Sequence, residues 1–277
     1  MVGEIRIGIS GWRYAPWRAD FYPRGLPQRA ELAYAAERMT AIEVNGSFYA
    51  LQRPASYQRW RSEVPDGFRF SVKGPRFITH MKKLADARTP LANFFASGVL
   101  ALGPVLGPVL WQLPPTLGYD ADRLRAFAAE LPRSTGAAAS LARQHDQRLD
   151  GEGRAWTASE DDRPIQHVLE VRHDTFRTPE FPELLRELGI GLVVADTAGR
   201  WPYFEDVTAD LVYVRLHGDS ELYVSGYDDP ALDRWAAKVL DWADRGLDVW
   251  VFFDNDTKVR APKDAMALIE RVRAART

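Results

Sequence analysis

The chain contains no cysteine. This absence excludes disulfide bonds, thiolate nucleophiles and metal sites built from cysteine ligands. No apolar run is long enough to cross a membrane, and the first strand pattern is not preceded by a secretory leader. We therefore expect a soluble cytoplasmic protein without a membrane partner.

An excess of charge of one sign is also lacking. The 36 basic and 38 acidic residues give a net charge of −2, so the sequence has no clear footprint for nucleic acid. The cofactor and the oligomeric state stay unknown, because no motif or composition bias indicates either. With 277 residues, 46% of them hydrophobic, the chain can bury one substantial core.

Eight short apolar runs alternate with helix-like stretches along the chain. This alternation predicts one α/β domain over residues 1–277, a TIM-type (β/α)₈ barrel whose first and eighth strands pair. The runs are Ile5–Ile9, Ala41–Val44, Phe68–Val72, Leu106–Leu113, His167–Val171, Ile190–Ala195, Leu211–Leu216 and Asp248–Phe253.

One connection is longer than a barrel needs. Residues 133–165 precede the fifth strand and combine an Ala-rich, helix-like first half with a charged second half. Connections of this length serve as lids, binding elements or structural excursions. Because this one enters the amino end of a strand, we favour a structural excursion.

Alternation within each strand separates the side chains that face the helices from those that face the barrel interior. In the third strand Phe68, Phe70 and Val72 form the apolar face, which leaves Ser71 and Lys73 pointing inward. The sixth and eighth strands are apolar on both faces, so the orientations of Asp196 and Asp254 stay open. The same reasoning gives a polar ring at the carboxyl ends of the strands: Glu43, Asn45, Lys73, Gln112, Glu170, Arg172, Arg215 and His217.

The polar ring has two interpretations. Buried charges cost several kcal/mol unless they are paired, so the ring could be an ion-pair network that caps the core. Its location at the end where barrel enzymes place their active sites favours function instead. In that case Glu43 and Glu170 are candidates for base or nucleophile, and His217 and Lys73 for proton donor, with Schiff-base formation by Lys73 as an alternative.

Binding groups surround these four candidate catalytic residues. Two arginines of the ring would hold an anionic group, and the amides of the ring would supply neutral hydrogen bonds. Aromatic residues in the loops after the strands would stack on a sugar or a base, unless they only cover the barrel mouth. The candidate substrate-binding residues are Trp12, Asn45, Tyr49, His80, Gln112, Arg172, Arg215, Tyr227 and Asn255.

Seven motifs that run in order along the chain resemble those of the YecE-like family, domain of unknown function 72. They are Gly8–Trp12, Glu43–Tyr49, Lys73–His80, Gln112–Pro115, Glu170–His173, Arg215–Gly218 and Phe253–Asp256. The resemblance implies a TIM-type barrel without an established activity. The chain departs from the family pattern at Asp254 and Asp264, where asparagine is usual, and at Val259, where glycine is usual. A tight turn with positive φ, and a phosphate-binding loop before the last helix, are therefore less secure.

Three functions remain open. The first is an enzyme that uses acid–base chemistry on a small polar or anionic, sugar- or nucleotide-like substrate, such as a hydrolase, lyase or isomerase. The second is a divalent-metal isomerase or endonuclease-like barrel, against which the interior arginines and lysine argue, so we assign no metal ligands. The third is a non-catalytic ligand-binding protein. If the protein were the divalent-metal barrel, its candidate ligands would be Glu43, Glu170, Asp196, His217 and Asp254.

Overall fold

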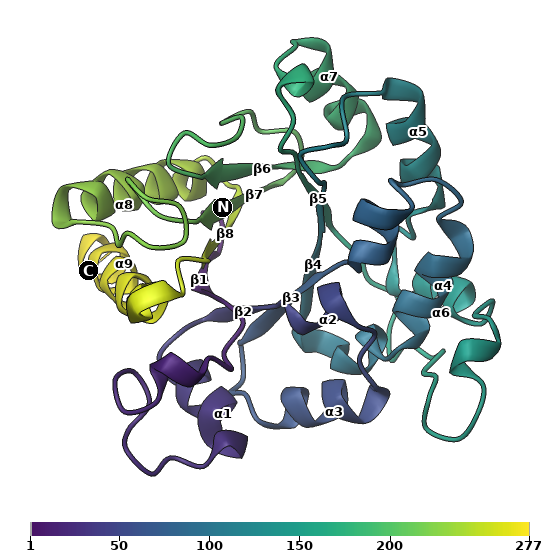
Figure 1. Cartoon of the computed structure of the whole chain (residues 1–277), viewed down its shortest axis with the longest axis horizontal. Helices are drawn as coiled ribbons and strands as arrows, with labels where there is room; N and C mark the ends of the chain where they lie inside the picture. Colours follow the sequence, from purple (N-terminus) through teal and green to yellow (C-terminus); the bar gives the residue numbers. More distant parts are fainter. Residues whose placement is uncertain (1, 277) are drawn as a thin grey trace.

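A computed structural model describes residues 2–276 and shows a closed barrel of eight parallel strands (Figure 1). The first and eighth strands pair, with Ile5 opposite Val249 and Ile9 opposite Phe253. Each strand expected from the sequence is confirmed to within one residue at each end. The strands are β1 Ile5–Ser10, β2 Ala41–Val44, β3 Arg69–Lys73, β4 Leu106–Gln112, β5 His167–Glu170, β6 Gly191–Asp196, β7 Leu211–Leu216 and β8 Asp248–Phe253.

Helices form a ring outside the strands (Figure 1). None of the helices within residues 2–276 is long and apolar enough to cross a membrane. A turn of π-helix, Phe77–Met81, follows β3 and carries His80. The α-helices are α1 Glu31–Ala36, α2 Gly46–Tyr49, α3 Pro54–Ser62, α4 Arg88–Ala96, α5 Ala121–Glu130, α6 Thr135–Ala142, α7 Glu180–Leu188, α8 Asp229–Asp244 and α9 Arg260–Ala275.

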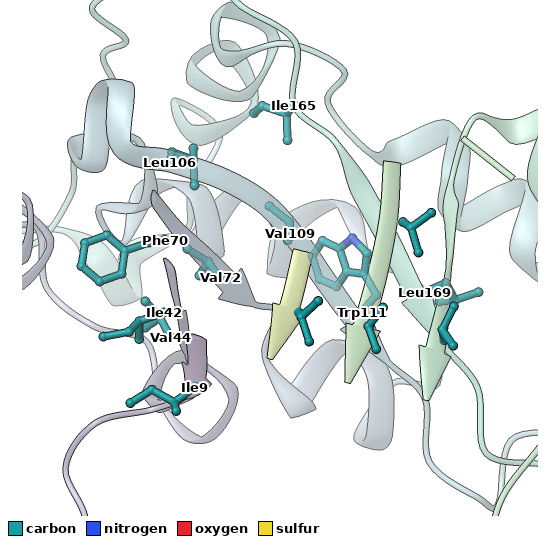
Figure 2. Packing of buried hydrophobic residues seen from close by; sticks show 14 of the residues in the cluster. Ile9, Ile42, Val44, Phe70, Val72, Leu106, Val109, Trp111, Ile165 and Leu169 are labelled. Atoms are coloured by element: carbon teal, nitrogen blue, oxygen red, sulfur yellow. The ribbon is translucent and has the colours of Figure 1, made fainter. Parts of the chain in front are cut away.

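The strands separate two apolar clusters. Outward residues such as Phe70, Val72 and Trp111 pack under the helices (Figure 2). Inward residues of the same sheet fill the barrel axis, among them Leu110 and Phe252. The alternation read from the sequence therefore assigns β3 and β4 correctly, and it leaves their inward positions at the carboxyl ends to polar side chains.

The long connection at residues 133–165 packs on the side of the barrel. Its helix α6 lies beside α4 (Figure 1). The backbone N–H of Trp156 donates to the carbonyl of Ala96 at 2.7 Å, and the Arg163 guanidinium donates to the carbonyl of Leu106, the first residue of β4. These contacts tie the connection to α4 and to the amino end of the barrel.

The turn into the last helix forms without glycine. Lys258 and Val259 have φ of 61° and 59°, in the left-handed region. We expected a turn with positive φ to be less secure here, because a β-branched side chain raises the energy of this conformation. The structure corrects that expectation, since Val259 keeps the conformation while its side chain is buried.

His167 is a buried structural residue at the start of β5. Its Nε2 lies 2.8 Å from the Pro132 carbonyl oxygen, and its Nδ1 accepts a hydrogen bond from Trp111 Nε1 at 3.1 Å. This pair of contacts requires the neutral ring with its proton on Nε2. Burial lowers the pKa of His167 to about 4.

We expect the neutral His167 ring to make stability depend on pH. The unfolded chain binds a proton at this residue below pH 6.5, whereas the folded chain does so only below about pH 4. The free energy of unfolding should therefore fall by up to about 3 kcal/mol as the pH drops through that window. Urea unfolding at several pH values should show this slope in the wild type and not in His167→Gln, which keeps one donor and one acceptor. Equal slopes in the two proteins would contradict this.

Candidate active site

Arg215, an inward residue of β7, is the centre of the polar ring. Its side chain is fully buried, and its guanidinium binds three carboxylates from three other strands or strand ends. The shortest distances are 2.9 Å to Glu43, 2.7 Å to Glu170 and 2.8 Å to Asp254. Burial would lower the pKa of Arg215, but the three carboxylates raise it well above its ordinary value. Arg215 is therefore a permanent cation that neutralises the acids around it.

Glu43 is fully engaged beneath the cavity. Its Oε1 accepts hydrogen bonds from Ser10 and Arg215, and its Oε2 accepts from Tyr213 and Arg215. The side chain has no exposed surface and does not line the cavity described below. A carboxylate with four donors on its two oxygens is well suited to orient Arg215.

Glu170 connects the two arginines. Its Oε1 accepts from Arg172 Nε at 2.8 Å and its Oε2 accepts from Arg215 Nη1 at 2.7 Å. Burial would raise the pKa of Glu170, but Arg172 and Arg215 hold it well below its ordinary value. Glu170 is thus ionised and, like Glu43, lies beneath the cavity.

His217 and Asp254 form a pair at the ends of β7 and β8. Arg215 Nη1 can only donate, so the Nε2 of His217, 3.3 Å away, accepts, and the neutral ring carries its proton on Nδ1. This Nδ1 lies 3.1 Å from Asp254 Oδ2, outside regular hydrogen-bond geometry. Burial and the charge of Arg215 lower the pKa of His217. His217 is therefore neutral near pH 7, and its role as a proton donor stays a prediction.

A cavity of about 670 Å³ opens over this cluster at the carboxyl ends of the strands. The candidate residues that line it are Trp12, Asn45, Tyr49, Lys73, His80, Gln112 and Arg172. Asp254, named above only as a candidate metal ligand, also lines the cavity, as do Arg13, Tyr14, Tyr223 and Asp256, which are not among the predicted site residues. The cavity therefore combines charged groups from below with aromatic rings at its sides.

Two candidates lie elsewhere. The hydroxyl of Tyr227 lies 3.1 Å from Asp196 Oδ2 and from the backbone nitrogen of Gly218. The amide nitrogen of Asn255 donates to Ser225 O and Asp264 Oδ2. Neither residue lines the cavity, so the structure does not bring them together with the other candidates, and their contact with a ligand stays a prediction.

The structure shows the orientations of Asp196 and Asp254, which the sequence left open. Val193 and Ala195 of β6 lie in the inner cluster, so Asp196 faces outward. Trp250 and Phe252 of β8 also face inward, and Asp254 continues their face into the cavity. Both faces of β8 are apolar, and Phe253 on the outer face is aromatic as well, so the sequence has no signal that would assign Asp254 to the cavity.

Lys73 differs from its neighbours in the ring. Its side chain is buried at the end of β3, and its Nζ lies 4.3 Å from the centre of the Phe48 ring. Within residues 2–276 the ammonium group of Lys73 forms no hydrogen bond or ion pair, because Arg172 and Arg215 engage the nearby carboxylates. Burial and the charge of Arg215 lower the pKa of Lys73 to about 8.

Arg172 lies beside the cavity with only 10% of its side chain exposed. Its guanidinium stacks on Trp201, 3.8 Å from the ring centre, and also contacts the Tyr223 hydroxyl at 3.3 Å. Stacking and the bond to Glu170 hold the guanidinium in one orientation. A fixed guanidinium at a cavity wall is a suitable anchor for a carboxylate or a phosphate.

The donor set also bears on metal binding. In the part of the chain that the structure describes, no three His, Asp or Glu side chains are arranged to hold a metal ion. Glu43, Glu170 and Asp254 instead share the guanidinium of Arg215. These acids are already committed to a cation that belongs to the protein.

The fold and the cavity place the chain in one class of protein. This class is the (β/α)₈ barrels with a polar cavity, walled by aromatic residues, at the carboxyl ends of the strands. Within that class the chain belongs to the family described as "Protein of unknown function DUF72", whose model matches residues 6–277. The resemblance inferred from the seven motifs is confirmed.

Relatives by sequence match part of the chain. The protein YecE of Escherichia coli (strain K12) is 32% identical over 129 residues, which cover 46% of this chain and 44% of that protein. YunF of Bacillus subtilis (strain 168) is 27% identical over 116 residues, 40% of each chain. The match thus spans less than half the length of these relatives.

Solved structures match over nearly the whole fold. A DUF72 family protein of Thermotoga maritima MSB8 has a TM-score of 0.76 at 22% identity, with 98% of this chain and 99% of the other covered. A DUF72 family protein of Enterococcus faecalis V583 has a TM-score of 0.74 at 16% identity, with 97% and 95% covered. These similarities show the fold.

Proposed function

We propose that the protein is an enzyme that binds a small anionic, sugar- or nucleotide-like substrate in this cavity and moves protons on it. The observation that carries the proposal is the buried side chain of Lys73, whose ammonium group faces the cavity without a hydrogen-bond partner among residues 2–276. A buried cation of this kind lowers stability, and a substrate anion would compensate for that cost. Its lowered pKa also lets it give or take a proton near neutral pH.

The other groups have distinct roles in this proposal. Arg172 holds the anionic group, and Lys73 exchanges protons with the substrate. Asp254, which keeps 13% of its side chain exposed, is the acid of the Arg215 cluster that reaches the cavity, with the neutral His217 behind it. Glu43, Glu170 and Arg215 hold these groups in place from below. The proposal thus moves the base from Glu43 and Glu170 to the residues that line the cavity.

Aromatic rings favour a substrate with a flat or sugar-like face. Trp12 packs edge-on against Trp60 at 5.2 Å, and Phe48 does so against His80 at 5.1 Å. Trp12 Nε1 and Asn45 Oδ1 are buried without a hydrogen-bond partner in the described structure. A bound hydroxyl or amide would satisfy such groups, as expected for a site that recognises a polar ring.

A ligand screen tests the proposal. Sugar phosphates, nucleotides and small carboxylates are added to the protein, and the thermal midpoint is measured. We expect some anions to raise the midpoint, and Arg172→Met to remove the effect. The matched control is Arg88→Met, because Arg88 is an exposed partner of Glu130.

Mass spectrometry of the compounds that bind then separates an enzyme from a binding protein. Conversion of a bound compound by the wild type supports the enzyme. Compounds that bind but stay unchanged indicate the non-catalytic alternative, and binding that Arg172→Met does not affect excludes this cavity as the site.

A further inference from the structure

Lys73 is set apart from the other lysines of the chain. Of the six lysines in the sequence it is the one at the end of a barrel strand, where it is 5% exposed. Lys82, Lys238 and Lys263 each form an ion pair with an acidic side chain at the surface. A lysine kept for ion pairing would be expected to contact a carboxylate in the same way.

The electrostatic surroundings of Lys73 favour the free amine. Burial and Arg215 lower its pKa to about 8, against the opposing effects of Glu43, Asp254 and Glu170. The imidazole of His80 is neutral at pH 7, since burial and the charge of Lys73 lower its pKa to about 4. About a tenth of Lys73 is therefore unprotonated at pH 7, on the order of a hundredfold more than for a surface lysine.

The cavity also provides a place for an anion beside this amine. Arg172 is fixed by Glu170 at 2.8 Å and by the ring of Trp201, and it lines the same cavity as Lys73. An unpaired amine and a fixed guanidinium together suit a molecule with an electrophilic carbon near an anionic group.

We propose that Lys73 captures a carbonyl compound that carries a carboxylate or a phosphate, and holds it as a Schiff base while Arg172 binds the anion. This inference rests on the proposed function and specifies its substrate class. The substrate is then an α-keto acid or an open-chain sugar phosphate.

The step balances without a further reactant. The free amine of Lys73 forms a carbon–nitrogen bond to the carbonyl carbon, and the carbonyl π electrons move to the oxygen. The nitrogen then gives up one proton and the oxygen takes up one, which gives a neutral carbinolamine. The carbon–oxygen bond of this carbinolamine then breaks, and the hydroxyl leaves as water with a second proton. Overall, one ammonium and one carbonyl give one iminium and one water. The iminium acidifies the neighbouring C–H bond, on which Asp254 could act as base.

Reductive trapping tests the Schiff base. The wild type is incubated at pH 7 with glyoxylate, pyruvate or dihydroxyacetone phosphate and sodium cyanoborohydride, and the labelled lysines are identified by peptide mass spectrometry. We expect the reduced adduct on Lys73 to form at least about tenfold faster than on Lys82. Acetaldehyde, which lacks an anion, should show a smaller preference for Lys73 than glyoxylate does.

Two variants complete the experiment. Arg172→Met should reduce the labelling of Lys73 by glyoxylate to the level found with acetaldehyde, and Lys73→Met should leave only slow labelling of surface lysines.

The outcomes separate the two proposals. If glyoxylate, pyruvate or dihydroxyacetone phosphate raises the thermal midpoint but labels Lys73 no faster than Lys82, the Schiff base is excluded while the proposed function stands. If they neither stabilise the protein nor label Lys73, both proposals fail for this substrate class.

Discussion

Replacement of Arg215 by methionine is expected to lower the free energy of unfolding by about 3–5 kcal/mol. Methionine fills much of the same volume, but it leaves the carboxylates of Glu43, Glu170 and Asp254 buried without their shared cation. At roughly 2–4 °C per kcal/mol for a chain somewhat smaller than this one, the thermal midpoint should fall by about 10 °C. Chemical unfolding of purified protein would measure the change.

The control for this prediction is an ion pair at the surface. Arg88→Met removes a 2.9 Å pair with Glu130, and it should change the free energy of unfolding by less than about 1 kcal/mol. If Arg215→Met does not fold, Arg215→Lys keeps the charge and should retain part of the stability. An Arg215→Met protein as stable as the wild type would mean that the carboxylates do not depend on Arg215.

The second large effect is expected for Glu170→Gln. The glutamine side chain has the same shape as glutamate but lacks the negative charge that holds Arg172 and Arg215. Its NH₂ group would face a donor nitrogen of one of these two arginines, with which it cannot form a hydrogen bond. Arg172 should lose its fixed orientation, and turnover of the substrate should fall by about a hundredfold, as for a misplaced binding group. The loss should appear in the affinity for anions as well as in kcat, because Glu170 acts through Arg172.

Thermal shifts with a binding anion measure this effect before a substrate is known. Glu130→Gln removes a surface carboxylate and is the matched control, expected to leave anion binding unchanged. The thermal midpoint of Glu170→Gln should fall by less than that of Arg215→Met, since Glu43 and Asp254 still neutralise Arg215. Wild-type anion binding in a folded Glu170→Gln protein would show that Glu170 does not position Arg172.

Much of the architecture could be predicted because the strands of this chain carry clear patterns. In β3, β5 and β7 apolar and polar residues alternate, so Lys73, Glu170 and Arg215 could be assigned to the interior. In β6 and β8 both faces are apolar, and only the structure shows that Asp196 points outward and Asp254 inward. Alternation along a strand assigns its inner face only where one face is apolar and the other is polar.

The depth of each side chain could not be predicted. Glu43 and Glu170 share the orientation of Lys73, but their four carboxylate oxygens are all bonded beneath the cavity, whereas Lys73 faces it. Residues beyond the strand ends have no alternation rule, which is why the sequence could not show that Tyr227 and Asn255 lie outside the lining of the cavity. A cytoplasmic location stays a prediction.

The free energy of unfolding of Lys73→Met, compared with that of the wild type, tests most directly whether the polar ring is an active site. The folded protein lowers the pKa of Lys73 to about 8, so below that pH the charged side chain lowers stability relative to the unfolded chain. Methionine should therefore raise the free energy of unfolding at pH 7, by about 1–3 kcal/mol, and this gain should disappear as the pH rises through 10. The exposed Lys82→Met is the control and should change little. A Lys73→Met protein that is several kcal/mol less stable at pH 7 would make Lys73 a structural counter-ion, and would contradict an active site at this end of the barrel.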